Sequence, residues 1–485
     1  MHVSVLVGAA LCALATRRLA LSLVDMLMVA FLALSLVSLI AASPPNMWLA
    51  VRAITLSVTA AAAYWTARYL ANEGYRRVLM GAVAVAVVLA ACTVLLDAYG
   101  VMNTSLVGRA PSGTFGVRNY AAHSIAVGLP TLPVLLLTTR SRRYMVGVAI
   151  GLALCVAALV LTRSRASWLA TALSLSTLAL VHLAFRSKLP AISAARKLAF
   201  AISIVTGIAI AVFVPTKLTW KSEQPHLDTL VDLVDTTKGT GRGRVLQYRN
   251  TLAMISHHPL FGVGPGQWHV YYPRYAPVGD PTLDNRQVWN TPARPTSDWI
   301  GITAERGIAA GAVLIGIFAL IALACIRSIR EGDPLAVAAV ATCVAVGVIG
   351  ALDCPMQMAT PNYLAAVIIA GTPLASRYAI ELGTVTRTAG CVLATVLAAA
   401  AVVCFGRQIQ ALRVAYDRAP AEVWDAAAEL SLGHQRLELA SAQAWLLADQ
   451  TDRAIERAKR ALRLNPHYGP AQKLIDLHPP TRGRR

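Results

Sequence analysis

Long runs of apolar residues follow one another along most of this chain. They lie at about 22–41, 48–67, 78–97, 119–138, 144–162, 167–185, 197–214, 299–326, 335–352, 362–376 and 388–405, with a shorter run at 3–16. A helix of roughly 17–25 apolar residues spans the hydrocarbon core of a bilayer. The pattern therefore predicts an all-α polytopic membrane protein of about 12 transmembrane helices. The run at 3–16 lacks a basic leading region and a small-residue cleavage site, so we expect a retained first helix.

Polar stretches divide the chain into four predicted parts. These are N-terminal transmembrane helices at 1–214, a large polar loop at 215–298, C-terminal transmembrane helices at 299–405 and a soluble helical tail at 406–485. The composition agrees, because a chain that is 56% hydrophobic and 14% charged falls outside the range of soluble domains.

The tail has apolar positions at helical spacing between Ala442 and Leu474, with a break near Gln450 and an end at Asn465-Pro466. Small residues at Ala454, Ala458 and Ala461 make it resemble a tetratricopeptide repeat. Only about one such repeat is clear, and a free-standing array needs three or more. We therefore expect the tail to pack on the membrane domain or on a protein partner. A capping helical hairpin is the alternative interpretation.

Basic residues cluster on alternate connections between the apolar runs, which predicts the orientation in the membrane. The basic connections hold Arg17/Arg18, Arg76/Arg77, Arg140/Arg142/Arg143, Arg186/Lys188/Arg196/Lys197, Arg327/Arg330 and Arg377/Arg387. We place these connections in the cytoplasm, so the 215–298 loop and the tail are expected outside. Long loops cross the membrane regardless of their charge, and a basic loop is therefore compatible with this orientation.

The eight cysteines give no sign of a disulfide framework or a metal site. All of them lie in or at the edge of apolar runs, and no C-x-x-C pair occurs. No histidine and cysteine spacing resembles a zinc site. We accordingly expect no cofactor and no metal, and no nucleic-acid partner.

The centre of the large loop is basic. From Lys238 to Arg274 there is no Asp or Glu, and the basic residues are Lys238, Arg242, Arg244, Arg249 and Arg274. This charge favours an anionic partner at a membrane surface. Val245, Tyr248, Leu252 and Ile255 repeat at helical spacing and predict a short amphipathic helix that packs on the membrane domain through this face. Arg244 and Arg249 then lie on its other faces.

Two more arginines, Arg163 and Arg165, lie where two predicted spans meet on the outer side. A charge there is costly unless it meets water or an anion. Arginine also binds phosphate through two parallel hydrogen bonds, which predicts a phosphate site. The alternative is that both side chains only extend to the membrane surface.

An ordered set of motifs resembles the O-antigen ligase and polymerase superfamily over about residues 20–376. The motifs are Gly113-Thr-Phe-Gly-Val-Arg-Asn119, Ser164-Arg-Ala166, Arg244-x-x-x-Tyr248, His258-Pro-Leu-Phe-Gly-Val-Gly-Pro-Gly266, Asp298-Trp-Ile, Ala304-Glu-Arg-Gly307 and Asp353-Cys-Pro355. The resemblance implies a multi-pass glycosyltransferase of the bacterial inner membrane. It would move a glycan from an undecaprenyl-diphosphate donor to a lipid, glycan or protein acceptor at the periplasmic face, with inversion and without a metal. Its diphosphate-binding arginines correspond to Arg165 and Arg244.

The same resemblance exposes a departure. Members have a histidine just before the Asn/Asp-aromatic pair at the end of the loop, and Thr296 occupies that position here. Threonine cannot act as the base that activates the acceptor hydroxyl. Asp298 is the nearest substitute, and His269 is a second one if the loop folds back. The alternative function is a non-catalytic scaffold of an envelope polysaccharide assembly. A transporter is the weakest interpretation, because no internal inverted repeat is evident.

Overall fold

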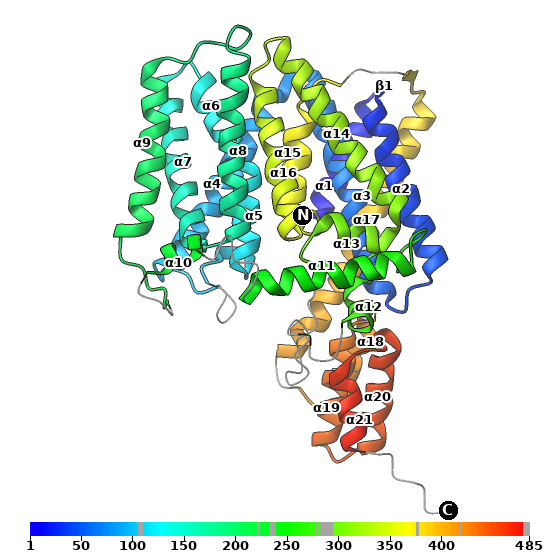
Figure 1. Cartoon of the computed structure of the whole chain (residues 1–485). Coiled ribbons are helices and arrows are strands. Elements are labelled where there is room, and N and C mark those ends of the chain that lie inside the picture. Colours follow the sequence, from blue (N-terminus) through cyan, green and yellow to red (C-terminus); the bar gives the residue numbers. More distant parts are fainter. Residues whose placement is uncertain are drawn as a thin grey trace, which may run out of the picture.

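The computed structural model describes residues 1–104, 110–220, 224–231, 239–276, 280, 294–374, 378–416, 419–431 and 433–478 (Figure 1). It confirms the all-α membrane fold, because each predicted apolar run contains a helix, although the run at 119–138 is divided into two and the helix of the run at 362–376 ends at Ala370. In this described part, nine helical segments are long and apolar enough to cross a membrane. One of them, Met47–Ala98, covers two predicted spans that turn at Gly74, where φ is 91°.

The helices before the large loop are α1 (His2–Ala15), α2 (Leu23–Ala42), α3 (Met47–Leu70), α4 (Arg76–Ala98), α5 (Arg118–Gly128), α6 (Thr131–Thr138), α7 (Arg142–Thr162), α8 (Arg165–Ala184) and α9 (Ala194–Phe213). The π-helical turn η1 (Ala71–Tyr75) joins α3 to α4, and the 3-10 turn η2 (Gly113–Phe115) precedes α5. After the loop come α13 (Asp298–Arg306), α14 (Ile308–Arg330), α15 (Leu335–Leu352), η3 (Pro355–Gln357), α16 (Ala359–Ala370) and α17 (Thr384–Tyr416).

The structure corrects the predicted span at 299–326. It divides into the short helix α13 and the spanning helix α14, which begins only at Ile308. Gly307 separates the two helices with φ of 86°, a conformation that residues other than glycine rarely adopt. The charged residues Glu305 and Arg306 stand directly before this break, inside the otherwise apolar run.

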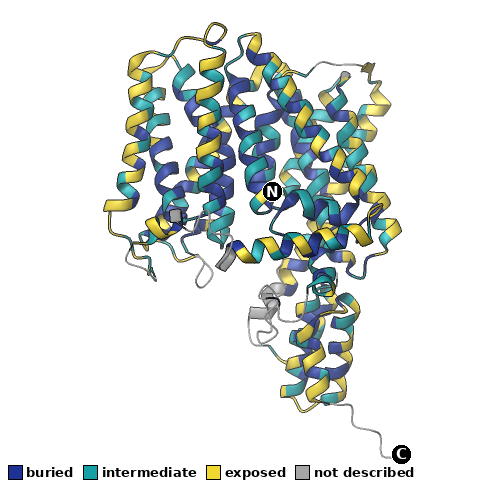
Figure 2. Cartoon of the chain, in the orientation of Figure 1, coloured by how far each residue is buried: buried dark blue, intermediate teal, exposed yellow. Residues whose placement is uncertain are grey.

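The core of the membrane domain lies around α4, α5, α7, α15 and α16, where buried apolar side chains cluster (Figure 2). Small residues let these helices approach closely, as is usual in membranes. A Cβ at Gly128 would lie 2.2 Å from Val87, and one at Gly207 would lie 2.5 Å from the Ala153 carbonyl oxygen. Helix α9 contributes many exposed apolar side chains, which suits contact with lipid.

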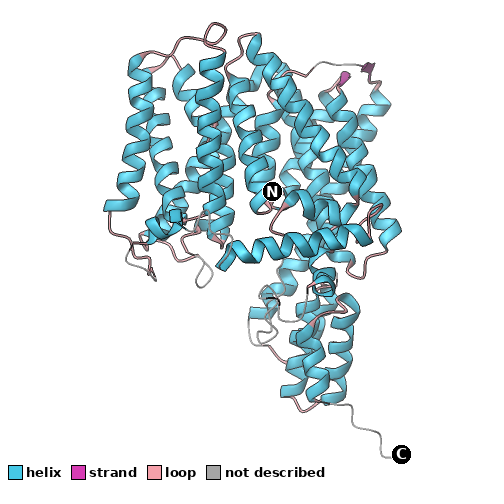
Figure 3. Ribbon diagram, in the orientation of Figure 1, coloured by secondary structure: helices cyan, strands magenta, loops and turns pink. Residues whose placement is uncertain are grey.

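The basic connections gather at one end of the helix bundle. Arg76 pairs with Asp333 at 2.5 Å, and Arg196 donates to the carbonyl oxygens of Leu137 and Thr139. The two short strands β1 (Arg18–Leu21) and β2 (Tyr378–Glu381) pair antiparallel at this end (Figure 3). Sequence patterning gave no sign of this sheet.

The described helices of the large loop, α10 (Pro225–Val231), α11 (Gly239–His257) and α12 (Trp268–Tyr275), lie at the opposite end (Figure 1). Helix α11 confirms the predicted helix of the basic loop, but its buried face differs from the predicted one. Val245 and Leu252 are 51% and 54% exposed, whereas Thr251 and Met254 are buried. The reason is that α12 folds back onto α11, and Trp268 Nε1 donates to Thr251 Oγ1 at 3.0 Å.

The tail lies at the same end as the loop helices (Figure 1). Helix α17 runs without a break past Phe405 to Tyr416, and α18 (Ala421–Leu430), α19 (Gln435–Leu447), α20 (Thr451–Leu464) and α21 (Gly469–Leu477) follow. The four tail helices pack each on the next, with Ala454, Ala458 and Ala461 fully buried. The helices predicted between Ala442 and Leu474 are therefore present.

Candidate functional site

A large cavity of about 870 Å³ opens between the membrane helices, the end of the large loop and the tail. We call it the chamber. Its deep part is apolar and is formed by α2, α3, α14, α15 and α16. The apolar lining includes Met28, Phe31, Leu32, Leu56, Ala60, Leu314, Ile317, Phe318, Ile321, Val346, Ala365 and Ile369. These residues lie within membrane-spanning helices or the adjoining α16, so the deep part suits a lipid chain.

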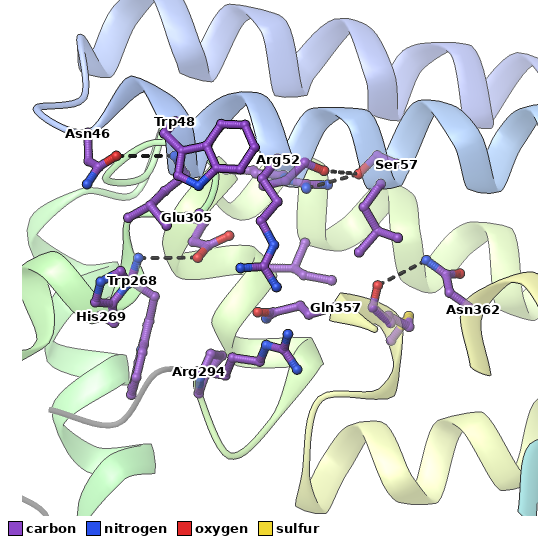
Figure 4. A pocket seen from close by; sticks show the side chains of 18 of the residues that line it. Asn46, Trp48, Arg52, Ser57, Trp268, His269, Arg294, Glu305, Gln357 and Asn362 are labelled. Atoms are coloured by element: carbon purple, nitrogen blue, oxygen red, sulfur yellow. Dashed lines mark hydrogen bonds between the residues drawn. The ribbon is translucent and has the colours of Figure 1, made fainter. Parts of the chain in front are cut away.

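The outer part of the chamber is cationic. Arg52 extends into it from α3, and Arg294 enters from the segment before α13, with Gln357 between them (Figure 4). Arg294 also stacks on Tyr120, with its Cζ 5.0 Å from the ring centroid. A smaller cavity of about 190 Å³ is lined by the same three polar side chains.

Several nitrogen atoms on the chamber walls are buried and have no hydrogen-bond partner among the described residues. They are Arg294 Nη1, Gln357 Nε2, Arg306 Nε and His434 Nδ1. Buried polar atoms are nearly always satisfied, so a group of unsatisfied ones at one cavity indicates a ligand that completes them. The three arginine and glutamine atoms are donors, and the expected ligand therefore carries acceptor oxygens.

The Gly-rich segment before α12 places His269 on the chamber wall. Val263 N donates to Ala304 O at 3.0 Å and Gly264 N donates to Glu305 O at 2.9 Å, which docks this turn on the end of α13. The Glu305 carboxylate then accepts from Trp268 N at 3.2 Å (Figure 4). The loop thus folds back. This is the condition under which the sequence analysis offered His269 as a second candidate base.

Electrostatics keep His269 neutral. Burial, together with the positive charges of Arg436 and Arg52, lowers the pKa of His269 to about 4. A neutral imidazole has a free nitrogen lone pair and can accept a proton at neutral pH. His269 is therefore in the correct protonation state for a base inside the chamber.

Asp298 occupies a different position. It is fully buried at the start of α13, and it is not part of the lining of either cavity. Its Oδ2 accepts from Met356 N at 2.6 Å, while its Oδ1 has no partner among the described residues. Burial raises the pKa of Asp298 well above its ordinary value, although the Met356 N–H opposes this effect. The carboxyl holds the η3 turn, which carries Met356 and Gln357 into the chamber.

A second polar group lies beside Asp298 and is built around Asp353. The Asp353 Oδ2 lies 2.9 Å from His123 Nε2, and His123 Nδ1 lies 2.8 Å from Ser167 Oγ. Although burial raises it, the His123 contact, the Cys354 N–H and Arg244 lower the pKa of Asp353 to about 2. Asp353 is thus an anion that orients neighbouring cations.

Arg244 lies within the electrostatic field of this anion and of Arg165. Arg165 is the first residue of α8, and Arg244 lies on α11, far apart in sequence. Burial lowers the pKa of Arg244, and the charge of Arg165 adds to the effect while Asp353 opposes it. Tyr248, one turn after Arg244, donates its hydroxyl to the Ala351 carbonyl oxygen. The structure thus brings together the two arginines for which the resemblance implied one role.

The remaining predicted phosphate ligands are not part of this group. Arg163 donates from Nε to Thr229 Oγ1 at 2.7 Å, and its Cζ lies 5.0 Å from the centroid of Trp220. Arg242 and Arg249 lie on exposed positions of α11. Lys238 falls outside the described residues.

Sequence reasoning missed Arg52, Arg294 and the tail residues at the chamber. A signal for Arg52 existed, because it is the single charged residue inside the apolar run at 48–67, where an ionisable group indicates a function. Arg294 and Arg436 carried no such signal. Their importance arises only from tertiary contacts.

Comparison with known proteins agrees with the motifs. Residues 150–315 match a family model described as O-antigen ligase, and no curated protein matches the sequence. The matched segment contains α8, α11, α12 and α13, which carry Arg165, Arg244, His269 and Asp298. Such a family indicates glycosyl transfer in polysaccharide assembly. Residues 150–315 are thus similar to the O-antigen ligase family.

Proposed function

We propose that this protein transfers a glycan from a polyprenyl diphosphate, of the undecaprenyl type, to an acceptor hydroxyl at the periplasmic face of the bacterial inner membrane. The observation that carries the proposal is the chamber, which is apolar at the depth of the spans and cationic at its outer end. Its walls hold N–H groups that have no partner in the part of the chain that the structure describes. A phosphate-bearing lipid has this distribution of apolar chain and anionic head.

Arg165 and Arg244 support a diphosphate site next to the chamber. Two positively charged guanidinium groups repel each other, and an anion between them is stabilising. Each guanidinium can also donate two parallel hydrogen bonds to phosphate oxygens. Asp353 also acts on the charge of Arg244. Guanidinium groups at this position are suited to a leaving diphosphate, which gains charge as its bond to the sugar breaks.

The proposed reaction is a single displacement. The acceptor oxygen forms a bond to the anomeric carbon while the bond from that carbon to the diphosphate oxygen breaks, with inversion. The hydroxyl proton passes to a base, and the diphosphate leaves with the bonding electron pair. We assign the base to His269, because it lies on the chamber wall and is neutral. Asp298 positions the η3 turn and is the alternative base.

Complementation of a deletion strain tests the function. Wild-type protein should restore the glycan profile of the envelope, whereas Arg165→Ala and Arg244→Ala should lose most transfer. Lysine at either position should rescue poorly, because it lacks the paired donors. Arg327→Ala, at an exposed residue of the basic end, is the matched control and should behave as wild type. Membrane levels of each variant are measured by immunoblot. Full transfer in both alanine variants would reject the diphosphate site.

One observation favours a second function, that of a scaffold. Thr296 stands where the resemblance places the catalytic histidine, and its hydroxyl is buried without a partner among the described residues. If the purified chain transfers no lipid-linked glycan from its own host, the scaffold replaces the transferase.

A further inference from the structure

We propose that the C-terminal helical unit, α18–α21, is the outer wall of the chamber and that its Arg436 binds, with Arg52, the phosphate group of a lipid-borne substrate. This inference rests on the proposed function. It assigns the tail a direct part in substrate binding, where its helical pattern alone would favour a docking module for another protein.

The tail and the membrane domain line one continuous cavity. From the tail, residues of two inter-helix turns reach it: His434 and Arg436 where α19 begins, and Tyr468 where α21 begins. The membrane domain contacts this edge, since Asn46 Nδ2 lies 3.4 Å from Gln435 Oε1. The same Asn46 accepts through its carbonyl oxygen from Gln267 Nε2 at 2.8 Å, next to His269. The tail therefore meets the chamber at the loop that carries the proposed base.

The start of α19 is shaped to face the chamber. Gly433 precedes it with φ of 88°, which turns the chain so that His434 and Arg436 line the cavity while Leu437 packs inward. A side chain at Gly433 would also approach Leu464 of α20 to 3.1 Å. The first N–H groups of a helix favour an anion, so α19 adds to the positive field of Arg436.

The charges around this wall are unbalanced. His269 and His434 each lie within the field of both Arg436 and Arg52, so both guanidinium groups are near these imidazoles. Lys473 adds a further cation to the lining. The lining holds fewer carboxylates than cations: Glu305 and Asp476 stand against Arg52, Arg294, Arg306, Arg436 and Lys473. An anion between Arg52 and Arg436 relieves the repulsion.

The occupant must combine a phosphate with an apolar chain, because the cationic wall continues into the apolar part of the chamber between α2, α3 and α14. Two substrates of the proposed reaction have this chemistry: the polyprenyl diphosphate donor and a phosphorylated lipid acceptor. A free phosphate lacks the chain. Three probes separate these sources: undecaprenyl diphosphate, bisphosphorylated lipid A and inorganic pyrophosphate.

The first experiment tests the position of the tail in the full-length protein. Asn46→Cys and Gln435→Cys are combined, and membranes are treated with a short bis-maleimide. The double variant should give an internal cross-link, seen after cleavage of a protease site inserted between residues 417 and 418. Each single variant reports the background from the eight native cysteines. If no cross-link forms above that background, the tail is not the outer wall of the chamber and the proposal is overturned.

The second experiment tests Arg436. In detergent, Arg436→Gln should bind one lipid probe roughly 10-fold to 100-fold more weakly than wild type, since a charge-assisted hydrogen bond is lost. Arg460→Gln, at a half-buried tail residue paired with Glu456, is the control and should bind as wild type. Binding is followed by the fluorescence of Trp48 and Trp268, which line the chamber. The lipid whose binding weakens in Arg436→Gln is the one whose phosphate Arg436 holds. Inorganic pyrophosphate should bind far more weakly than either lipid.

The outcomes separate this inference from the proposed function. If Arg436→Gln binds both lipids as wild type does while Arg294→Gln loses binding, Arg436 does not bind the phosphate. The chamber then remains a substrate site without this part of the tail. If wild-type protein binds neither lipid, the proposed function fails and this inference fails with it. A loss confined to pyrophosphate would also contradict the proposal, because the occupant would then need no lipid chain.

Discussion

At the residue scale, a few atoms on the chamber wall decide what the site can hold. Arg306 illustrates the point, because its Nη2 donates to Ser57 Oγ at 3.0 Å and its Cζ lies 4.8 Å from the Phe31 ring centroid, while its Nε is unpartnered among the described residues. The guanidinium is thus held by two contacts and offers a remaining donor. A buried donor left without an acceptor costs about 1–3 kcal/mol. A ligand that supplies the acceptor recovers this energy.

The two candidate bases give pH profiles that fall at different pH values. If His269 accepts the proton, kcat/KM should stay level from pH 8 to about 5 and fall as pH drops through its pKa near 4, where the imidazole becomes protonated. If Asp298 were the base, its raised pKa would place that fall at a higher pH. The rate of transfer from a purified lipid-linked donor, measured against pH, distinguishes the two.

Substitution tests the same assignment. His269→Gln should lower transfer by roughly 10²–10⁴-fold, as expected for loss of a general base. Asp298→Asn keeps an oxygen that can accept from Met356 N, so its effect should stay below about tenfold. Thr296→Ala should be mild, and it serves as the control near Asp298. A silent His269→Gln together with an inactive Asp298→Asn would move the base to Asp298.

At the scale of elements, each spanning helix was predictable because an apolar run of sufficient length is a local property of the sequence. The break at Gly307 and the buried face of α11 were not. Gly307 is needed because the turn from Leu260 to Gly266 packs against it, and Met254 is buried because α12 lies over it. Both depend on partners distant in sequence. Sequence motifs pointed to Arg165 and Arg244 as candidate phosphate ligands. The chamber could not be predicted, because its walls come from segments that are distant in sequence.

Gly307 offers a test at this scale. In Gly307→Ala the new Cβ would lie 2.0 Å from the Leu260 carbonyl oxygen, at a backbone φ of 86° that alanine rarely adopts. The Ile308 N to Pro259 O hydrogen bond of 2.9 Å would be strained as well. We expect a loss of about 1–3 kcal/mol in the free energy of unfolding, together with reduced transfer. Gly347→Ala, with open space around its Cβ, is the control. Equal melting temperatures for the two variants would contradict this account.

At the scale of the molecule, function depends on which side of the membrane each end of the bundle faces. The loop helices and the tail share one end, and the basic connections share the other (Figure 1). Arginine- and lysine-rich short loops stay in the cytoplasm, which predicts a periplasmic tail and chamber. A reporter active only in the periplasm should work when fused after Arg485 and fail when inserted after Lys188, at the basic end between α8 and α9. A reporter active only in the cytoplasm should give the reverse pattern. Cytoplasmic activity after Arg485 would place the chamber on the wrong side for a periplasmic acceptor, and the proposed transfer could then not occur there.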